Sequence, residues 1–149
     1  MNKTVIITGA AKGIGRAIAK DFAYSGYNVC INYNTSEEKA KELCQELAKD
    51  GCNVIIYKAD VTNRQEVDKM VDYVIGTFGN IDVLINNAGI SEYKLFTDIT
   101  QEDMEKMVNV NILGVFNTTQ SVLKKSMLSR KDGTIINISS IWGMVGASL

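Results

Sequence analysis

Five short and mostly apolar runs alternate along this chain with stretches of helical periodicity. We expect the runs to be strands at Val5–Thr8, Val29–Tyr33, Val54–Tyr57, Val83–Ile85 and Thr134–Ile138. Runs of this composition are typical of strands that are covered on both faces. Strands separated by helices predict a parallel sheet built from right-handed βαβ units. The sequence therefore predicts an α/β fold, a doubly wound parallel sheet in three αβα layers, forming one domain over residues 1–149.

The stretches between the runs carry helix signals. Thr35-x-x-Glu38 and Thr62-x-x-Gln65 have the spacing of capping boxes and predict the starts of the second and third helices. A longer helix is expected from about 101 to 128. The apolar faces of the first three helices are expected to consist of Ile14, Ala17, Ile18 and Phe22; of Ala40, Leu43, Cys44, Leu47 and Ala48; and of Val67, Met70, Val71, Val74, Ile75 and Phe78.

Composition excludes several classes of function. An apolar fraction of 46% and a charged fraction of 22% over 149 residues are typical of a soluble globular domain. The net charge of −1 provides no basic excess for nucleic acid or for an anionic membrane surface. The apolar runs are too short to cross a bilayer, and no signal peptide is evident.

The cysteine and histidine content also restricts the possible functions. The three cysteines, Cys30, Cys44 and Cys52, form no C-x-x-C pair, so we expect reduced thiols in a cytoplasmic protein. The chain contains no histidine, which excludes a histidine base and histidine–metal sites. No metal site is predicted.

The predicted topology brings two segments to one crevice. Ligands of doubly wound sheets bind at the carboxyl ends of strands where the strand order reverses, here between the first and fourth strands. The turn TGAAKGIG, residues 8–15, and Asn86–Gly89 should therefore face each other. A helix that begins after a glycine-rich turn offers backbone N–H groups to a pyrophosphate. Taken alone, such a turn is weak evidence, because glycines in this position can also serve only a tight connection that binds nothing.

Further motifs follow the strands in order. Asp60-Val61 ends the third strand and Asn86-Asn87-Ala88-Gly89 ends the fourth, after Thr8-Gly9 and Gly13-Ile14-Gly15 at the first. In this order the motifs resemble the short-chain dehydrogenase/reductase family over the whole chain. The resemblance implies a Rossmann-type domain that binds a nicotinamide cofactor, with Asp60 near the adenine amine and Asn87-Ala88-Gly89 behind the adenine ribose. The cofactor-binding residues would be Gly9, Ala11, Lys12, Gly13, Ile14, Gly15, Asp60, Val61, Asn87, Ala88 and Gly89.

The end of the second strand bears on which nicotinamide cofactor binds. An NAD site usually places a carboxylate there, but this stretch reads Asn32-Tyr33-Asn34-Thr35-Ser36, with no acid before Glu37. Lys12 could approach a 2′-phosphate as a point charge, although it could also be an ordinary solvated lysine. Asn34, Thr35 and Ser36 could donate hydrogen bonds to that phosphate. We therefore predict NADP(H), with NAD(H) as the alternative, and include Tyr33–Ser36 in the cofactor site.

Two residues are candidates for the chemistry. Asn111 falls in the apolar stripe of the long helix, so its amide is either a structural bridge or functional. Residues 110–116 resemble the family stretch whose asparagine holds a water in a proton relay. Residues 133–143 resemble the family's fifth strand, whose serine hydrogen-bonds the substrate carbonyl; Ser140 would be that catalytic serine and Ser139 its structural neighbour.

The family's proton donor has no counterpart in these residues. The family pairs a tyrosine with a lysine four residues later, about thirteen positions beyond the serine. None of the six tyrosines of this chain has a lysine four positions on. The chain is therefore expected to be the amino-terminal part of a longer enzyme, inactive alone. Its long helix would expose an apolar flank that favours homo-oligomers.

Within the family, the chain most resembles the bacterial 3-oxoacyl-[acyl-carrier-protein] reductases, by residues 32–34, 36–40 and 108–111. This resemblance implies hydride transfer from NADP(H) to the β-ketone of an acyl thioester in fatty acid synthesis, with a small-molecule or acyl-thioester substrate. The alternative is a non-catalytic dinucleotide-binding module.

Overall fold

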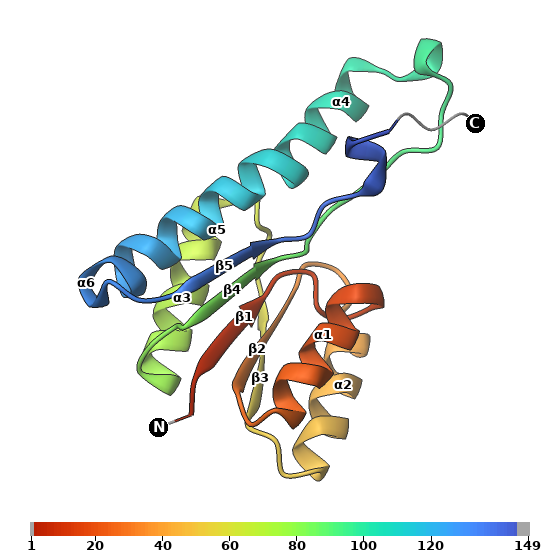
Figure 1. Ribbon diagram of the computed structural model, residues 1–149. Helices are drawn as coiled ribbons and strands as arrows, with labels where there is room; N and C mark the ends of the chain where they lie inside the picture. The colour runs from red at the N-terminus through yellow and green to blue at the C-terminus, as the bar shows by residue number, and fades with distance from the viewer. Residues whose placement is uncertain (1, 146–149) are drawn as a thin grey trace.

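The computed structural model describes residues 2–145 (Figure 1). Its single sheet has five strands in the order β3-β2-β1-β4-β5, and every neighbouring pair is parallel. The strands are β1 (Thr4–Ile7), β2 (Asn28–Tyr33), β3 (Val54–Lys58), β4 (Val83–Asn86) and β5 (Thr134–Asn137). Each predicted strand is present with both ends within one residue. The order reverses between β1 and β4, as predicted.

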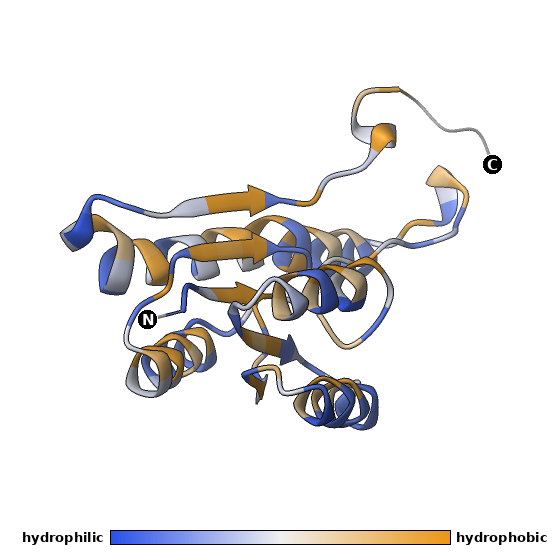
Figure 2. Cartoon of the chain, turned by 60° about the horizontal axis from the view of Figure 1, so that its bottom comes forward, coloured by the Kyte–Doolittle hydropathy of each residue, from blue (hydrophilic) through white to orange (hydrophobic). Residues whose placement is uncertain are grey.

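Helices cover both faces of the sheet (Figures 1 and 2). Helices α1 (Gly13–Tyr24) and α2 (Glu37–Lys49) lie on one face, and α3 (Arg64–Phe78) and the long helix lie on the other. The long helix runs from 101 to 130 as α4 (Gln101–Val108), a π-helical turn (Asn109–Leu113), α5 (Gly114–Val122), a second π-helical turn (Leu123–Met127) and α6 (Leu128–Arg130). The fold is thus the predicted Rossmann-type three-layer sandwich. The π-helical turns were not predicted.

Successive side chains of each strand point to opposite faces of the sheet, so the core consists of two clusters, one on each face. On β1, Val5 and Ile7 pack toward α1 and α2, whereas Ile6 packs toward α3 and α5. The predicted inward faces of α2 and α3 are largely confirmed, because Leu43 and Leu47 of α2 and four residues of α3 are buried. Figure 2 shows the strands as apolar segments between helices of mixed hydropathy.

The predicted face of α1 is wrong in part. Ile14 is 64% exposed and Ala17 is also exposed, whereas the buried residues of α1 are Gly15, Ala19 and Ala23. These three small residues recur every four positions and let the helix approach the sheet closely. Side-chain size, rather than apolarity, therefore selects the inward face of this helix.

Both predicted capping boxes are wrong by one residue. Helix α2 begins after Ser36 with no side-chain cap, and Asn63, not Thr62, caps α3 by accepting from Gln65 N and Glu66 N. The Thr62 hydroxyl is used elsewhere, since it donates to Asp60 Oδ1 at 2.8 Å. A complete capping box does occur at the start of α4, where Thr100 and Asp103 exchange hydrogen bonds.

The long helix leaves apolar side chains in solvent. Met104, Val108, Ile112 and Phe116 are each more than 40% exposed, and α4 buries no residue. Within residues 2–145, no helix combines the length and apolarity that a membrane crossing requires.

Candidate functional site

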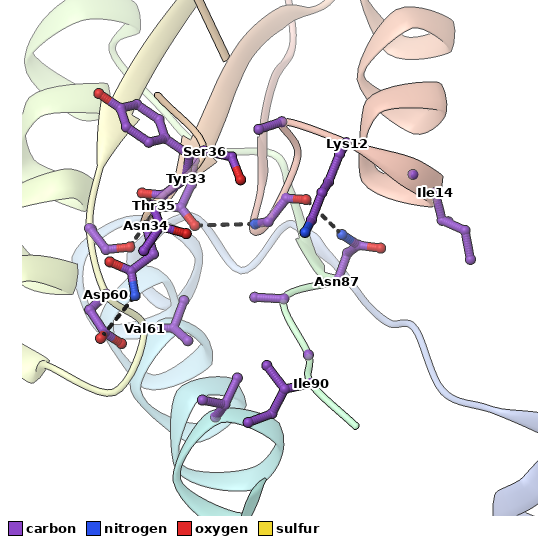
Figure 3. A pocket seen from close by; sticks show the side chains of 18 residues that line it. Lys12, Ile14, Tyr33, Asn34, Thr35, Ser36, Asp60, Val61, Asn87 and Ile90 are labelled. Atoms are coloured by element: carbon purple, nitrogen blue, oxygen red, sulfur yellow. Dashed lines mark hydrogen bonds between the residues drawn. The ribbon is translucent and has the colours of Figure 1, made fainter. Parts of the chain in front are cut away.

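A cleft of about 590 Å³ opens at the carboxyl edge of the sheet, where the strand order reverses. Figure 3 shows Lys12 and Ile14 on one side of it and Asn34, Thr35 and Ser36 on the other, with Asp60 and Val61 beside the latter group. Every residue predicted to bind the cofactor lines this cleft except Gly15. Four residues that were not predicted also line it: Asn32, Ala59, Ile90 and Val110.

The two glycines with positive φ angles in the turn after β1 have different surroundings. Gly9 and Gly13 have positive φ angles of 63° and 57°, which favour glycine. A side chain at Gly9 would lie 3.0 Å from the Ala88 backbone, whereas one at Gly13 would meet nothing within 4 Å. Gly9 is therefore required for packing, while Gly13 leaves the helix start open toward the cleft.

The start of α1 fits an anion. The first hydrogen bond of the helix runs from Arg16 N to Lys12 O, so the N–H groups of residues 13–15 have no intrahelical partner. Lys12 occupies the N-cap position, and its side chain makes no capping bond. Free N–H groups at the positive end of a helix, with an exposed lysine beside them, suit a pyrophosphate.

Gly15 lies beneath the turn rather than in the cleft wall. A Cβ placed on Gly15 would lie 2.4 Å from Asn87 Nδ2 and 2.7 Å from Gly9 O. The Asn87 side chain donates to Thr8 O at 2.9 Å and to Gly9 O at 3.2 Å. In return, Thr8 Oγ1 accepts from Asn87 N and Ala88 N. The segments after β1 and β4 are thus locked together, as the shared crevice requires.

The edge formed by β2 and β3 carries the polar groups of the opposite wall. Asn34 donates to Asp60 Oδ2 at 3.0 Å, while Asp60 Oδ1 accepts from the backbone N–H and the hydroxyl of Thr62. The first acid on α2, Glu37, lies 2.8 Å from Lys41 Nζ. The hydrogen bond from Lys41 lowers the pKa of Glu37, so this carboxylate is engaged along its own helix.

Asn32 was missed because it stands within a strand. Its side chain is buried, accepts from Gly9 N and donates to Ala59 O at 3.0 Å. Its carbonyl accepts from Ala10 N at 2.9 Å. One residue therefore ties the glycine turn to the ends of β2 and β3. The available signal was an amide within an otherwise mostly apolar run, since a buried amide needs partners.

The two candidate catalytic residues lie outside this cleft. Asn111 is in the first π-helical turn, where its Nδ2 donates to Ile90 O and its Oδ1 accepts from Ile90 N, both at 2.9 Å. Asn111 therefore bridges the long helix to the segment after β4. Ser140 is exposed at the N-cap of a 3-10 turn, where its Oγ accepts from Trp142 N at 3.2 Å.

The thiols and acids form no metal centre in the part of the chain that the structure describes, since no three of them gather there. Cys30 is buried within the sheet, and burial raises the pKa of its thiol to about 12.

Comparison with known proteins decides the family. The model of the family described as short chain dehydrogenase matches residues 3–149. The chain belongs to the short-chain dehydrogenase family.

Curated relatives and a solved structure extend this finding. The chain is 40% identical over 146 residues to the 3-oxoacyl-[acyl-carrier-protein] reductases FabG of Staphylococcus epidermidis and Staphylococcus aureus, which covers 98% of the chain and 59% of each relative. It is 36% identical to the uncharacterized oxidoreductase YmfI of Bacillus subtilis. The chain thus spans about three-fifths of the length of these relatives.

The crystal structure of the F189W actinorhodin polyketide ketoreductase with NADPH matches with a TM-score of 0.93 at 33% identity. The match covers 98% of this chain and 56% of that one. A solved family member with bound NADPH therefore shares the backbone course of this short-chain dehydrogenase chain.

Proposed function

We propose that residues 1–149 form the cofactor-binding part of an NADP(H)-dependent carbonyl reductase whose substrate is the β-ketone of an acyl thioester. The observation that carries this proposal is the open start of α1, where Gly13 and Ile14 line the cleft. The names of the relatives, 3-oxoacyl reductase and ketoreductase, support the substrate class. When bound, the nicotinamide supplies the hydride.

The cleft divides by chemistry into subsites. The N–H groups of residues 13–15 would hold the pyrophosphate, with Lys12 supplying positive charge. Asn34, Thr35 and Ser36 would bind the 2′-phosphate, since no carboxylate of β2 competes there and Glu37 is paired with Lys41. Asp60 Oδ2 accepts one hydrogen bond from the described residues and can accept another from the adenine amine.

Reduction of a carbonyl also needs a proton donor, and residues 1–149 contain no tyrosine–lysine pair of the kind that the family uses as one. Reduction of a ketone builds negative charge on oxygen, which a positioned acid must neutralise. The Ser140 hydroxyl would donate to that oxygen. Asn111 would hold the segment after β4 through Ile90 and bind a water with its remaining N–H. The 149 residues contain no tyrosine with a lysine four positions later, so we expect no turnover from them alone.

The lack of a tyrosine followed four positions later by a lysine also favours a second candidate function, a non-catalytic dinucleotide-binding module. Oxidation of NADPH with an acetoacetyl thioester tests it. Turnover by residues 1–149 would refute the module and would show that another group supplies the proton. Binding of NADPH without turnover agrees with either a module or the cofactor-binding part of a larger enzyme.

The cofactor preference is tested by fluorescence titration with NADPH and NADH. We expect tighter binding of NADPH, and a loss of about fivefold for NADPH in Lys12→Ala, the equivalent of about 1 kcal/mol for one exposed charge pair. NADH should be affected less. Lys49→Ala is the matched control, because Lys49 lies in the last turn of α2, away from the cleft. Equal affinity for the two cofactors, or tighter NADH, would refute the preference.

We further propose a homo-oligomer in the cytoplasm. The exposed apolar side chains of the long helix support the oligomer, and three cysteines without a disulfide among them agree with a reducing compartment.

A further inference from the structure

Helix α5 buries polar residues against the strand ends that carry the cleft. Asn117 and Thr118 are at most 4% exposed, and Gly114 is buried one turn earlier. The Thr118 hydroxyl donates to Asn86 Oδ1 at 2.6 Å, at the end of β4. None of these residues lines the cleft. A buried polar face costs free energy unless it is fully hydrogen-bonded, so its contacts indicate what it positions.

Asn117 contacts the segment after β3. Its Nδ2 donates to Val61 O at 3.0 Å and to Thr62 O at 3.3 Å. Gly114 contacts the side chain of the same Val61, since a Cβ placed on Gly114 would lie 2.6 Å from Val61 Cγ2. The helix therefore fixes both the backbone and the side chain of one cleft residue.

In the segment 59–63 after β3, Val61 is the residue whose backbone N–H has no partner among the described residues. By contrast, Asp60 N donates to Glu66 Oε2 and Thr62 N donates to Asp60 Oδ1. Val61 is buried but lines the cleft. The peptide that carries this N–H is held on its other side by Asn63 N, which donates to Asp60 O at 3.0 Å. Asn117 fixes the two peptides that follow it, through the carbonyls of Val61 and Thr62, and so restricts rotation of the Val61 backbone.

We infer that Asn117 is a positioning residue for adenine recognition, acting through Val61; the inference rests on the proposed function. Adenine offers an amine donor at N6 and an acceptor at N1. Asp60 Oδ2 and Val61 N–H are the complementary acceptor and donor. Hypoxanthine reverses both groups, with an oxygen at C6 and a proton on N1, so the pair discriminates between these bases only while its geometry is held.

The test compares affinities for NADPH and for its hypoxanthine analogue, reduced nicotinamide hypoxanthine dinucleotide phosphate. We expect the wild type to prefer NADPH by about tenfold, because the analogue leaves buried polar groups unpaired. Asn117→Ala should reduce this preference to less than about threefold, whereas a merely structural role would weaken both ligands equally.

Ser121→Ala is the matched control. Ser121 lies one turn farther along α5, is fully buried, and donates to Asp68 Oδ1 of α3 at 2.6 Å. Its loss should lower stability and leave the base preference unchanged. Gly114→Ala is the second test variant, because it retains the Asn117 amide but displaces Val61.

The wild type supplies a readout that needs no variant. The side-chain amide resonances of Asn117 should shift on addition of NADPH and shift less with the hypoxanthine analogue. Unchanged base preference in folded Asn117→Ala and Gly114→Ala, or equal shifts of the wild type with both ligands, would overturn the inference. Absence of NADPH binding to the wild type would instead overturn the proposed function.

Discussion

Replacing Gly15 by alanine should destabilise the domain although alanine favours helices. The added Cβ would lie 2.4 Å from Asn87 Nδ2, 2.7 Å from Gly9 O and 2.9 Å from Ala10 Cα. Two of these three atoms belong to the backbone, so the turn itself must move. Overpacking of this kind costs about 2 kcal/mol.

Displacement of the Asn87 side chain adds to this cost. Its two hydrogen bonds to the carbonyls of Thr8 and Gly9 contribute about 1 kcal/mol each. The higher helix propensity of alanine returns at most about 1 kcal/mol. The expected net loss is about 3 kcal/mol, a large share of the stability of a domain.

Urea denaturation followed by circular dichroism measures this loss. With a slope of about 2 kcal/mol per molar urea, the midpoint should fall by about 1.5 M. Gly76→Ala is the matched control, because Gly76 lies inside α3 with nothing within 4 Å of an added Cβ. That variant should gain up to about 1 kcal/mol. If Gly15→Ala were as stable as the wild type, the close approach of α1 to the Asn87 lock would be refuted.

Three further predictions concern other parts of the chain. The pKa of Asp103 is lowered from 3.8 to about 2, mainly by the hydrogen bond from Lys94 and to a smaller extent by the hydrogen bonds from Thr100. The stability that Asp103 contributes should therefore be complete above pH 4 and disappear as the pH falls toward 2; an Asp103→Asn variant with the same pH profile as the wild type would contradict this. Cys30, fully buried with its pKa raised to about 12, should react with an aromatic disulfide only after unfolding, and rapid labelling of the native protein would count against the fold around β2. Self-association measured by light scattering should weaken in the double variant Ile112→Glu and Phe116→Glu, and a wild type that stays monomeric at high concentration would rule out that apolar flank as the contact.

The strands and most of the cleft could be predicted because they depend on local patterns. Apolar runs bounded by turns fixed β1–β5 to within one residue, and parallel topology then placed residues 8–15 and 86–89 in one crevice. The reversal in strand order could be predicted without any knowledge of side-chain contacts. The residues that line the cleft then followed from this topology together with the order of the motifs.

The wrong or missing predictions concern features that packing or competing hydrogen bonds determine, namely the inward face of a helix, its capping residue and the partners of buried amides. Helix α1 turns Gly15 inward and Ile14 outward, since close approach to the sheet requires a small residue there. Thr62 fails as a cap because its hydroxyl binds Asp60. The roles of Asn32 and Asn117 depend on carbonyl partners 25 to 56 residues away in the sequence, which no local pattern specifies.

Because β1 lies at the centre of the sheet, its two edges must be paired at different times during translation. One edge of β1 pairs with β2, beginning at Asn28, while the other edge pairs with β4, where Val5 meets Val83. At a synthesis rate of about 5–20 residues per second, this second edge stays bare for several seconds after β2 has left the ribosome. The lock between Thr8 and Asn87 closes only then, so the ability to capture a nucleotide should emerge in one late step of translation, and an arrested nascent chain that displays only the first three strands should bind none.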